Sequence, residues 1–281
     1  MKPDIDQAKS GVIYASLASI VFLVAAATAD GAEKPGCTIP TFEDNFLDNS
    51  LDKMKWSILN ARKPEAEHPK SGLQNYSANG VKTGPGGLQI VISEKQPGSQ
   101  YWSGRIGTKQ AFLYGHFEFE AKLPVGRGLW PGLWMRTPTN LPLNGEIDLV
   151  EAFGSDPNAF QSTLHPWVDG RENRQYCALI SVRGLSTVKR PACATVSDKI
   201  KLSSNLSKDF HTYAVDWKPD QITWSLDGIP YFSVREEIPA SPMAIFINLA
   251  ISPLHDGASD ESLRLPQILA VRKVRVCEGF N

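Results

Sequence analysis

Short stretches in which hydrophobic and polar residues alternate follow one another from Thr41 onward, and helical periodicity is weak. These stretches run from Leu88 to Ser93, Phe117 to Lys122, Thr212 to Trp217, Gln221 to Leu226, Ala244 to Ala250 and Val271 to Val276. Turn sequences separate them, for example GPGG at residues 84–87 and the pair Asp227-Gly228. Regular short strands with such turns predict an all-β, antiparallel β-sandwich and not a parallel α/β fold.

The first 32 residues differ from the rest of the chain. Lys2 and Lys9 precede an apolar run over residues 12–27, and Ala27-Thr28-Ala29 has an A-x-A-like cleavage pattern. This pattern predicts a secretory signal peptide over residues 1–32 and a secreted protein, extracellular or periplasmic. An uncleaved membrane anchor is the alternative, because the run approaches the ~20 residues that span a bilayer.

Residues 33–281 are predicted to form a single domain. The chain has 281 residues with 42% hydrophobic content, which is enough for one large core. It shows no internal repeat and no linker rich in Gly, Ser or Pro. The net charge of -1 argues against nucleic acid or an anionic membrane as a partner, because both need a basic face. We expect a monomer.

All four cysteines, Cys37, Cys177, Cys193 and Cys277, lie after the predicted signal peptide. Export makes disulfides feasible, and four cysteines allow three connectivities. We favour a bond between Cys177 and Cys193, which would close an irregular segment, and one between Cys37 and Cys277, which would tie the domain ends together. A zinc site is the alternative, but no C-x-x-C spacing or neighbouring histidine supports it.

Three carboxylates are crowded into GEIDLVEAFG, residues 145–154. On a strand, Glu146 and Asp148 would face the same way, whereas Glu151 would face the opposite side. A β-bulge at Leu149-Val150 would return Glu151 to the side of the other two. The sequence therefore predicts a row of three acids on one face.

Such a row has unusual acid-base chemistry. Electrostatic repulsion opposes ionisation of all three carboxyl groups at this spacing, so at least one should keep its proton towards neutral pH. A protonated carboxyl beside an ionised one is what cleavage of a glycosidic bond requires. A solvated acidic strand face is the alternative interpretation.

The sequence GEIDLVE resembles the E-x-D-x-x-E signature of glycoside hydrolase family 16, in its bulged, laminarinase-like form. The similarity extends in family order over nearly the whole chain after Glu33. It includes FEDNFLDNSLDKMKW from Phe42, QNYSANGV from Gln74, YWSGRIGT from Tyr101, YGHFEFEAKLPVGRGLWPGLWM from Tyr114, DFHTYAVDWKPDQITWSLDG from Asp209 and MAIFINLAI from Met243. The resemblance implies a β-jelly roll, of concanavalin-like type, with a substrate cleft across its concave sheet.

By this resemblance Glu146 would be the nucleophile, Glu151 the general acid and base, and Asp148 their helper. The reaction would be a double displacement with retained configuration, which requires carboxyl groups ~5 to 5.5 Å apart. No metal or organic cofactor is needed. A structural calcium ion occurs in such folds, but nothing in this sequence requires one.

Aromatic platforms are expected because sugar rings present apolar C–H faces. Trp130 and Trp134 lie just upstream of the acids and would share one face of an extended segment. Core tryptophans are the alternative, and the resemblance favours the cleft. For Trp102, which we include as a candidate, and for Trp167 the sequence does not decide between cleft and core.

Further substrate contacts follow from the resemblance alone. Trp217 matches a position at the floor of the cleft, although a structural role is nearly as well supported. His165 matches a histidine that hydrogen-bonds within the catalytic row. Arg105, and Asn75 or Asn79, match positions expected to bind sugar hydroxyls. His211 is assigned a structural role.

These features predict a secreted endo-β-glucanase that cleaves β-1,3 or mixed β-1,3/1,4 glucan. The alternatives are a transglycosylase or a hydrolase of galactan or bacterial exopolysaccharide on the same fold, and a glucan-binding protein without catalysis. After INLA the family usually has a Gly-Gly-x-Trp-like segment, whereas this chain has ISPLHDG from Ile251, so the family pattern does not predict that edge of the cleft. Residues 169–207 are expected to form loop surface near the cleft.

Overall fold

The computed structural model describes residues 39–60, 72–94, 101–137, 145–168, 171–172, 174–184, 186–197 and 199–279. The predicted signal peptide and Cys37 lie outside the described residues. Within the described ranges, no helix has the length and apolar character needed to cross a membrane.

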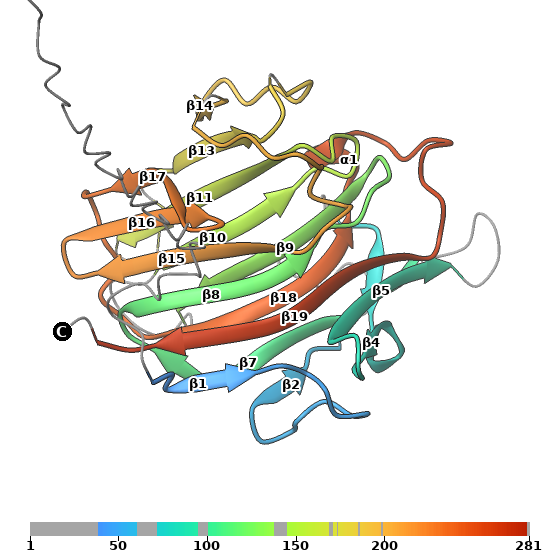
Figure 1. Ribbon diagram of the computed structural model, residues 1–281, viewed down its shortest axis with the longest axis horizontal. Helices are drawn as coiled ribbons and strands as arrows, with labels where there is room; N and C mark the ends of the chain where they lie inside the picture. The colour runs from blue at the N-terminus through green and yellow to red at the C-terminus, as the bar shows by residue number, and fades with distance from the viewer. Residues whose placement is uncertain are drawn as a thin grey trace, which may run out of the picture. The chain divides into compact units, whose positions relative to one another are not determined.

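Two β-sheets form the domain that contains residues 39–279 (Figure 1). The first sheet has the order β17 (Ile229–Val234), β16 (Gln221–Leu226), β15 (His211–Lys218), β8 (Gly115–Lys122), β19 (Gln267–Cys277), β5 (Leu88–Glu94), β6 (Tyr101–Ser103) and β3 (Gln74–Tyr76), with β1 (Phe42–Asp44) on β19 and β4 (Val81–Lys82) on β5. The second has the order β14 (Ala194–Val196), β13 (Tyr176–Ser181), β11 (Ala159–Val168), β10 (Gly145–Ala152), β9 (Leu129–Arg136), β18 (Met243–Ile251), β7 (Arg105–Phe112) and β2 (Trp56–Ile58), with β12 (Arg171–Glu172) on β11. Two short helices are described, η1 (Ala78–Gly80) and α1 (Pro253–Asp256).

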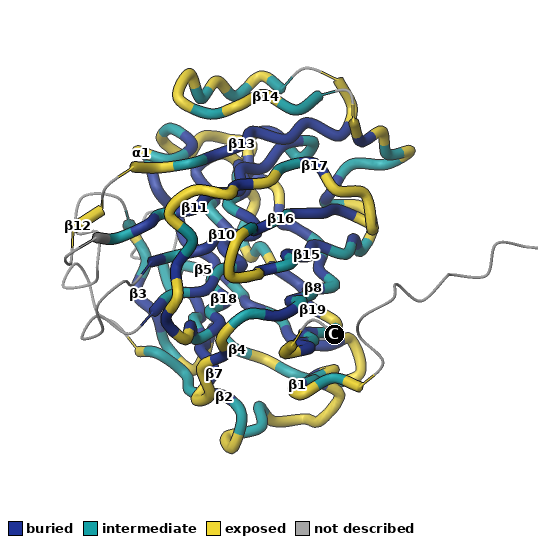
Figure 2. The backbone as a smooth tube through the Cα atoms, turned by 90° about the vertical axis from the view of Figure 1, so that its left-hand side faces the viewer, coloured by how far each residue is buried: buried dark blue, intermediate teal, exposed yellow. Residues whose placement is uncertain are grey.

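The alternation of residue types along each strand decides which side chains enter the core. In β8, Phe117 and Phe119 are fully buried, whereas the intervening Glu118 and the next acid, Glu120, are partly exposed. The same alternation in β9 and β18 buries one face of the second sheet against the first. Figure 2 shows buried segments along the strands and exposed segments in the turns around them. The opposite face of the second sheet is left free to carry polar side chains.

The predicted all-β sandwich is confirmed, and each of the six predicted strands lies within an observed one. Two details are wrong. The pairs β3–β6 and β13–β14 are parallel, so both sheets are mixed. Residues 169–207 are not loop surface throughout, because they contain β12, β13 and β14. Strand β13 has an unbroken run of buried side chains rather than an alternating pattern, and this explains why its sequence did not indicate a strand.

The predicted disulfide between Cys177 and Cys193 is present. It joins β13 to the residue that precedes β14, across a sequence separation of 16 residues. The second predicted disulfide involves Cys37, which lies outside the described residues, and remains a prediction.

Candidate active site

Strand β10 has the predicted bulge and carries the three carboxylates on one face. Its register with β9 and β11 shifts between Asp148 and Glu151, which is the signature of a β-bulge. Leu149 and Val150 therefore both enter the core and are at most 1% exposed. Glu146 and Glu151 are partly exposed, and Asp148 between them is buried. One inserted residue thus turns Glu151 to the side of the other two acids.

The bulge needs support because it turns backbone carbonyl groups into the core. Trp224 of β16, in the opposite sheet, donates its indole N–H to the Asp148 carbonyl over 3.0 Å. The Ser162 hydroxyl donates to the Leu149 carbonyl over 2.6 Å and also contacts the Tyr231 hydroxyl at 2.8 Å. All of these contacts are buried, so the geometry of the acid row depends on side chains remote in sequence.

The Trp224→Phe variant should be less stable by about 1–3 kcal/mol, because the buried Asp148 carbonyl loses its donor. Urea unfolding measures this difference. Trp217→Phe is a matched control, since Trp217 is equally buried and its indole donates to the Pro239 carbonyl, away from the bulge, over 3.1 Å. Both variants should lose stability, but only Trp224→Phe should change the titration of the carboxylates. Unchanged stability of Trp224→Phe would show that the bulge does not need this donor.

The neighbouring strand β11 supplies polar partners to each acid. His165 lies opposite Glu146, Thr163 opposite Asp148 and Gln161 opposite Glu151. The His165 Nε2 atom is 3.0 Å from Asp148 Oδ2, and its Nδ1 is 2.5 Å from Glu172 Oε1.

Glu151 accepts several hydrogen bonds. The Thr163 hydroxyl donates to Glu151 Oε2 over 3.1 Å, and the Gln161 amide donates to the same atom over 3.3 Å. The indole N–H of Trp130, on β9, lowers the pKa of Glu151. The β11 partners Thr163 and Gln161 were not identified from the sequence, since small polar residues on a strand carry no signal of their own.

Burial and mutual repulsion set the proton affinity of the row. Burial, followed by repulsion from Asp148, raises the pKa of Glu146 to about 8 and that of Glu151 to about 7. Burial opposes a charge on His165, but its carboxylate neighbours, above all Asp148, raise its pKa to about 10. At neutral pH the row therefore retains a proton while His165 carries a positive charge, which agrees with the predicted acid-base chemistry.

The pKa of Glu146 implies a pH-dependent cost to stability. Because this pKa rises from 4.5 to about 8 on folding, the stabilising effect of the bound proton is full below pH 4.5 and is lost as pH rises through 8. The Glu146→Gln variant cannot ionise. Its stability relative to the original chain should therefore increase from pH 5 to pH 8.5, by on the order of 1 kcal/mol, or about 2–4 °C in Tm.

Thermal unfolding at the two pH values measures this change. Glu118→Gln is a control of opposite sign. His116, whose Nε2 lies 3.6 Å from Glu118 Oε2, and the charge of Lys273 hold the pKa of Glu118 at about 2 despite partial burial, so its ionised form stabilises the fold at neutral pH. That variant should lose stability at neutral pH. A Glu146→Gln difference that is constant with pH would contradict the raised pKa.

Strand β9 places aromatic and basic side chains beside the acids. Trp134 pairs with Asp148 and Arg136 pairs with Glu146 in the register between the two strands. Arg136 Nε is 3.6 Å from Glu146 Oε2, and its guanidinium lies 4.4 Å from the centre of the Trp167 ring. A cation therefore lies beside Glu146, and the sequence did not indicate it because the register of β9 on β10 determines its position.

The structure brings Arg105 and Trp134 together. Trp134 donates its indole N–H to Asn248 Oδ1 over 2.7 Å and stacks on Phe246 with ring centres 4.6 Å apart. The Arg105 guanidinium lies 5.2 Å from the Trp134 ring centre. Both side chains lie on the sheet face that carries the acids, and their roles in substrate binding remain predictions.

The other predicted substrate contacts lie on strands of the first sheet. Trp217 is in β15 of the opposite sheet with no exposed surface, so its assignment to the cleft floor is wrong; the core encloses it. Asn75 in β3 is only 3% exposed. Trp102 in β6 is partly exposed, and both strands belong to the edge of the first sheet. A substrate contact for Asn75 or Trp102 remains a prediction.

One residue beside the acid row was not expected from the sequence. His255, in α1 of the segment ISPLHDG, stacks on Trp130 with ring centres 4.5 Å apart and an angle of 12° between the planes. One face of Trp130 is thus covered by His255. The departure from the family pattern at ISPLHDG indicated that this edge of the cleft would differ. It did not indicate which side chain would pack against Trp130.

Ligand atoms of Glu146, Asp148 and His165 lie within 4.8 Å of one another, a spacing that suits a metal ion. The chemistry of the donors does not suit one. Both imidazole nitrogens of His165 face carboxylates, and the raised pKa keeps the ring protonated, whereas a metal needs a neutral nitrogen. The three side chains form an ion-paired network.

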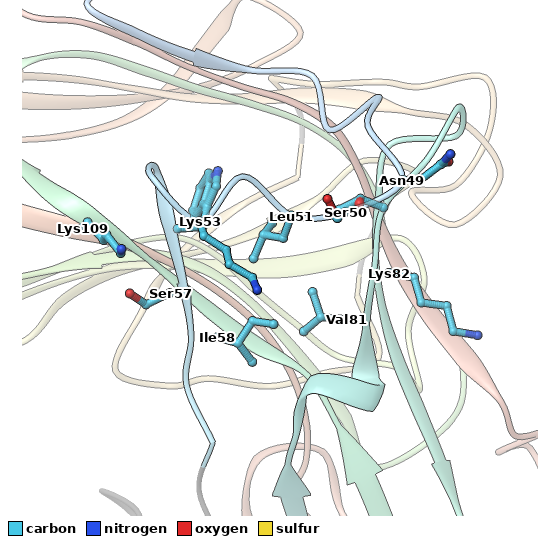
Figure 3. A pocket seen from close by; sticks show the side chains of 11 residues that line it. Asn49, Ser50, Leu51, Lys53, Ser57, Ile58, Val81, Lys82 and Lys109 are labelled. Carbon is cyan, nitrogen blue, oxygen red and sulfur yellow. The ribbon is translucent and has the colours of Figure 1, made fainter.

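A separate hollow of about 750 Å³ lies at β2, β4 and β7 (Figure 3). Leu51, Ile58 and Val81 line its interior, and Lys53 and Lys109 extend beside them. None of the three acids or their aromatic neighbours lines it. The acid row on the second sheet, and not this hollow, is therefore the candidate active site.

Comparison with known proteins agrees with this site. The family model for glycosyl hydrolases family 16 matches residues 72–261. A beta-glucanase of Rhodothermus marinus is 31% identical over 169 residues, which are 57% of this chain and 52% of that protein. A glucan endo-1,3-beta-glucosidase A1 of Niallia circulans is 27% identical over 274 residues, which are 84% of this chain and 37% of that protein. The chain therefore spans about half or less of the length of these two curated relatives.

Solved structures share the fold. The laminarinase catalytic domain from Thermotoga maritima MSB8 superposes with a TM-score of 0.70 at 22% identity, covering 86% of this chain and 99% of that one. A beta-glucanase of Bacillus licheniformis gives a TM-score of 0.67 at 20% identity, covering 86% of this chain and 100% of that one. These likenesses confirm the predicted jelly-roll sandwich.

Proposed function

Because the chain belongs to glycosyl hydrolases family 16, we propose that it is a secreted endo-β-glucanase that cleaves β-1,3 or mixed β-1,3/1,4 glucan with retained configuration. The observation that carries the proposal is the row of Glu146, Asp148 and Glu151 on one face of a bulged strand. The names of the relatives, a beta-glucanase and a glucan endo-1,3-beta-glucosidase, support glucan as the substrate class.

The neighbours of the two glutamates support distinct roles. Arg136, at 3.6 Å, and the charged His165 both favour an ionised Glu146. Burial and Asp148 raise the pKa of both glutamates, so the two share one retained proton, and the reaction proceeds from the form in which Glu151 holds it. In the first step Glu146 attacks the anomeric carbon while Glu151 protonates the leaving oxygen. In the second, Glu151 takes a proton from a water molecule while the water oxygen bonds to the anomeric carbon, and the bond from that carbon to Glu146 breaks.

Asp148 links the two roles. It lies between the glutamates and pairs with His165 at 3.0 Å, so its negative charge is balanced by the imidazolium. That charge disfavours ionisation of both glutamates together. The row therefore starts with one glutamate ionised and one protonated, which is the state that the first step consumes.

Product analysis of the mature protein on laminarin, lichenan, agarose and xyloglucan tests the proposal. Early release of mid-sized oligomers from laminarin or lichenan would support an endo-β-glucanase. Products longer than the added substrate would indicate transglycosylation instead. Binding of these polysaccharides without cleavage would contradict the enzymatic proposal and favour a glucan-binding protein.

A further inference from the structure

We propose that His255 is a positioning residue for Glu151, acting through Trp130 and through the backbone of Ala152. The inference rests on the proposed function, because it takes Glu151 as the acid and base. Nothing in the family pattern leads to it, since His255 lies in ISPLHDG, where this chain departs from that pattern.

His255 reaches Glu151 by two independent routes. Its ring stacks on Trp130, with 4.5 Å between ring centres, and Trp130 lies two residues from Gly132, the β9 partner of Glu151, where its indole N–H lowers the pKa of that carboxyl group. Its Nε2 atom lies 3.2 Å from the carbonyl oxygen of Ala152, the residue that follows Glu151 in β10. A change at His255 would therefore move both the indole donor and the strand that carries the carboxyl group.

The ring of His255 is held from its other side as well. Phe153 stacks on it with ring centres 4.6 Å apart and an angle of 6° between the planes. The guanidinium of Arg190 lies 4.8 Å from the Phe153 ring centre and donates to the His255 carbonyl over 2.5 Å. Arg190 precedes Cys193, so the disulfide to Cys177 anchors this end of the stack.

Short polar contacts fix the backbone of α1. The Ser252 hydroxyl accepts a hydrogen bond from the His255 N–H over 3.2 Å and thereby caps the helix. Asp256 accepts from the backbone N–H groups of Gly128 and Ser155 over 2.8 and 3.0 Å, respectively. Gly128 directly precedes β9 and Ser155 follows β10, so the helix is tied to the ends of the two strands that carry Trp130 and Glu151 (Figure 1).

The environment also selects one protonation state of the ring. Burial, followed by the charge of Arg190, lowers the pKa of His255 to about 3, so the imidazole is neutral. The Ala152 carbonyl can only accept, and Nε2 must therefore carry the single ring proton. A neutral ring with a defined donor suits a scaffold for Glu151 and does not suit direct proton transfer to substrate.

The test compares three variants, His255→Ala, His255→Phe and Trp130→Phe, with kinetics across pH. His255→Ala removes the stack and the donor, and kcat on glucan should fall about 10- to 100-fold with KM changed less than about threefold. His255→Phe keeps a ring against Trp130, and its kcat should fall less than that of His255→Ala. A glycoside with a dinitrophenolate leaving group, which needs no protonation, should be less affected than glucan.

The pH profile separates positioning from general damage to the fold. The indole donor stabilises the ionised form of Glu151, so its displacement should raise the pKa of that carboxyl and move the alkaline limb of kcat/KM to higher pH. Trp130→Phe removes the donor directly and should shift the limb in the same direction. His211→Phe is the matched control: His211 is buried in the first sheet, where it hydrogen-bonds Asp227 over 2.8 Å, and its replacement should leave the limb in place.

Folded His255 variants with the original kcat and alkaline limb would overturn the inference. If His255→Ala does not fold, His255→Phe and Trp130→Phe decide the question by the same two readouts. Glu146→Gln and Glu151→Gln are measured in parallel. Retained turnover in those two would refute the proposed function, whereas their inactivity beside unchanged His255 variants would refute only the positioning role.

Discussion

Replacing Glu146 with Gln is expected to lower reducing-sugar release from laminarin or lichenan by on the order of 10⁴-fold or more, as for loss of a nucleophile in other enzymes. The amide has the shape of the carboxyl group but cannot attack the anomeric carbon. Glu146 is partly exposed, and glutamine has nearly the same shape, so the variant should fold. It should also keep its affinity for glucan, because the aromatic side chains of β9 are unchanged.

Glu120→Gln is the matched control for this variant. Glu120 is a partly exposed strand carboxylate on β8, in the sheet that does not carry the acid row, and its replacement should leave turnover unchanged. Unfolding and polysaccharide binding are measured on both variants. Unchanged sugar release by a folded Glu146→Gln protein would refute the nucleophile assignment.

The bulge in β10 shows how far a local pattern can be interpreted. The spacing of Glu146, Asp148 and Glu151 breaks strand alternation by one residue, and only a bulge returns the third acid to its face without burying it. Both the bulge and the row could be predicted because the core excludes an unpaired carboxylate. The six alternating strands were predictable for the same reason, since alternation records which face meets the core.

The partners of the row could not be predicted because strand pairing across the chain creates them. Arg136 stands beside Glu146 only through the register of β9, and Trp224 supports the bulge from the opposite sheet, 76 positions away in sequence. Trp217 and Trp224 show that the sequence does not reveal the tertiary surroundings of a side chain. Both lie in strands whose alternation indicates burial, yet the resemblance placed Trp217 in the cleft, whereas the structure encloses it in the core.

His255 shows a different limit of prediction from a family resemblance. A resemblance transfers only residues that match, and ISPLHDG matches nothing in the expected segment. A short helix capped by Ser252 fills the same edge and brings an imidazole against Trp130. A local departure from a family sequence thus identified where new contacts would occur, but not their chemistry.

Replacing Glu151 with Ala should lower turnover of glucan by about 10²- to 10⁴-fold, because the leaving oxygen loses its proton donor. The loss should be much smaller for formation of the glycosyl-enzyme from an aryl β-glycoside whose dinitrophenolate departs unprotonated. Release of that intermediate still needs a base to activate water, so it should accumulate. Stopped-flow measurement of dinitrophenolate should then show a burst followed by a slow phase.

Azide tests which side of the sugar Glu151 occupies. It needs no base, and the space left by the missing carboxyl group admits it, so azide should accelerate the slow phase. Its nitrogen would displace the Glu146 carboxylate from the anomeric carbon and give a β-glycosyl azide, the configuration of the substrate. An α-glycosyl azide would mean that azide had replaced the nucleophile itself, and the roles of Glu146 and Glu151 would be exchanged. The anomer formed therefore decides between the two assignments, which a simple loss of activity in either variant cannot do.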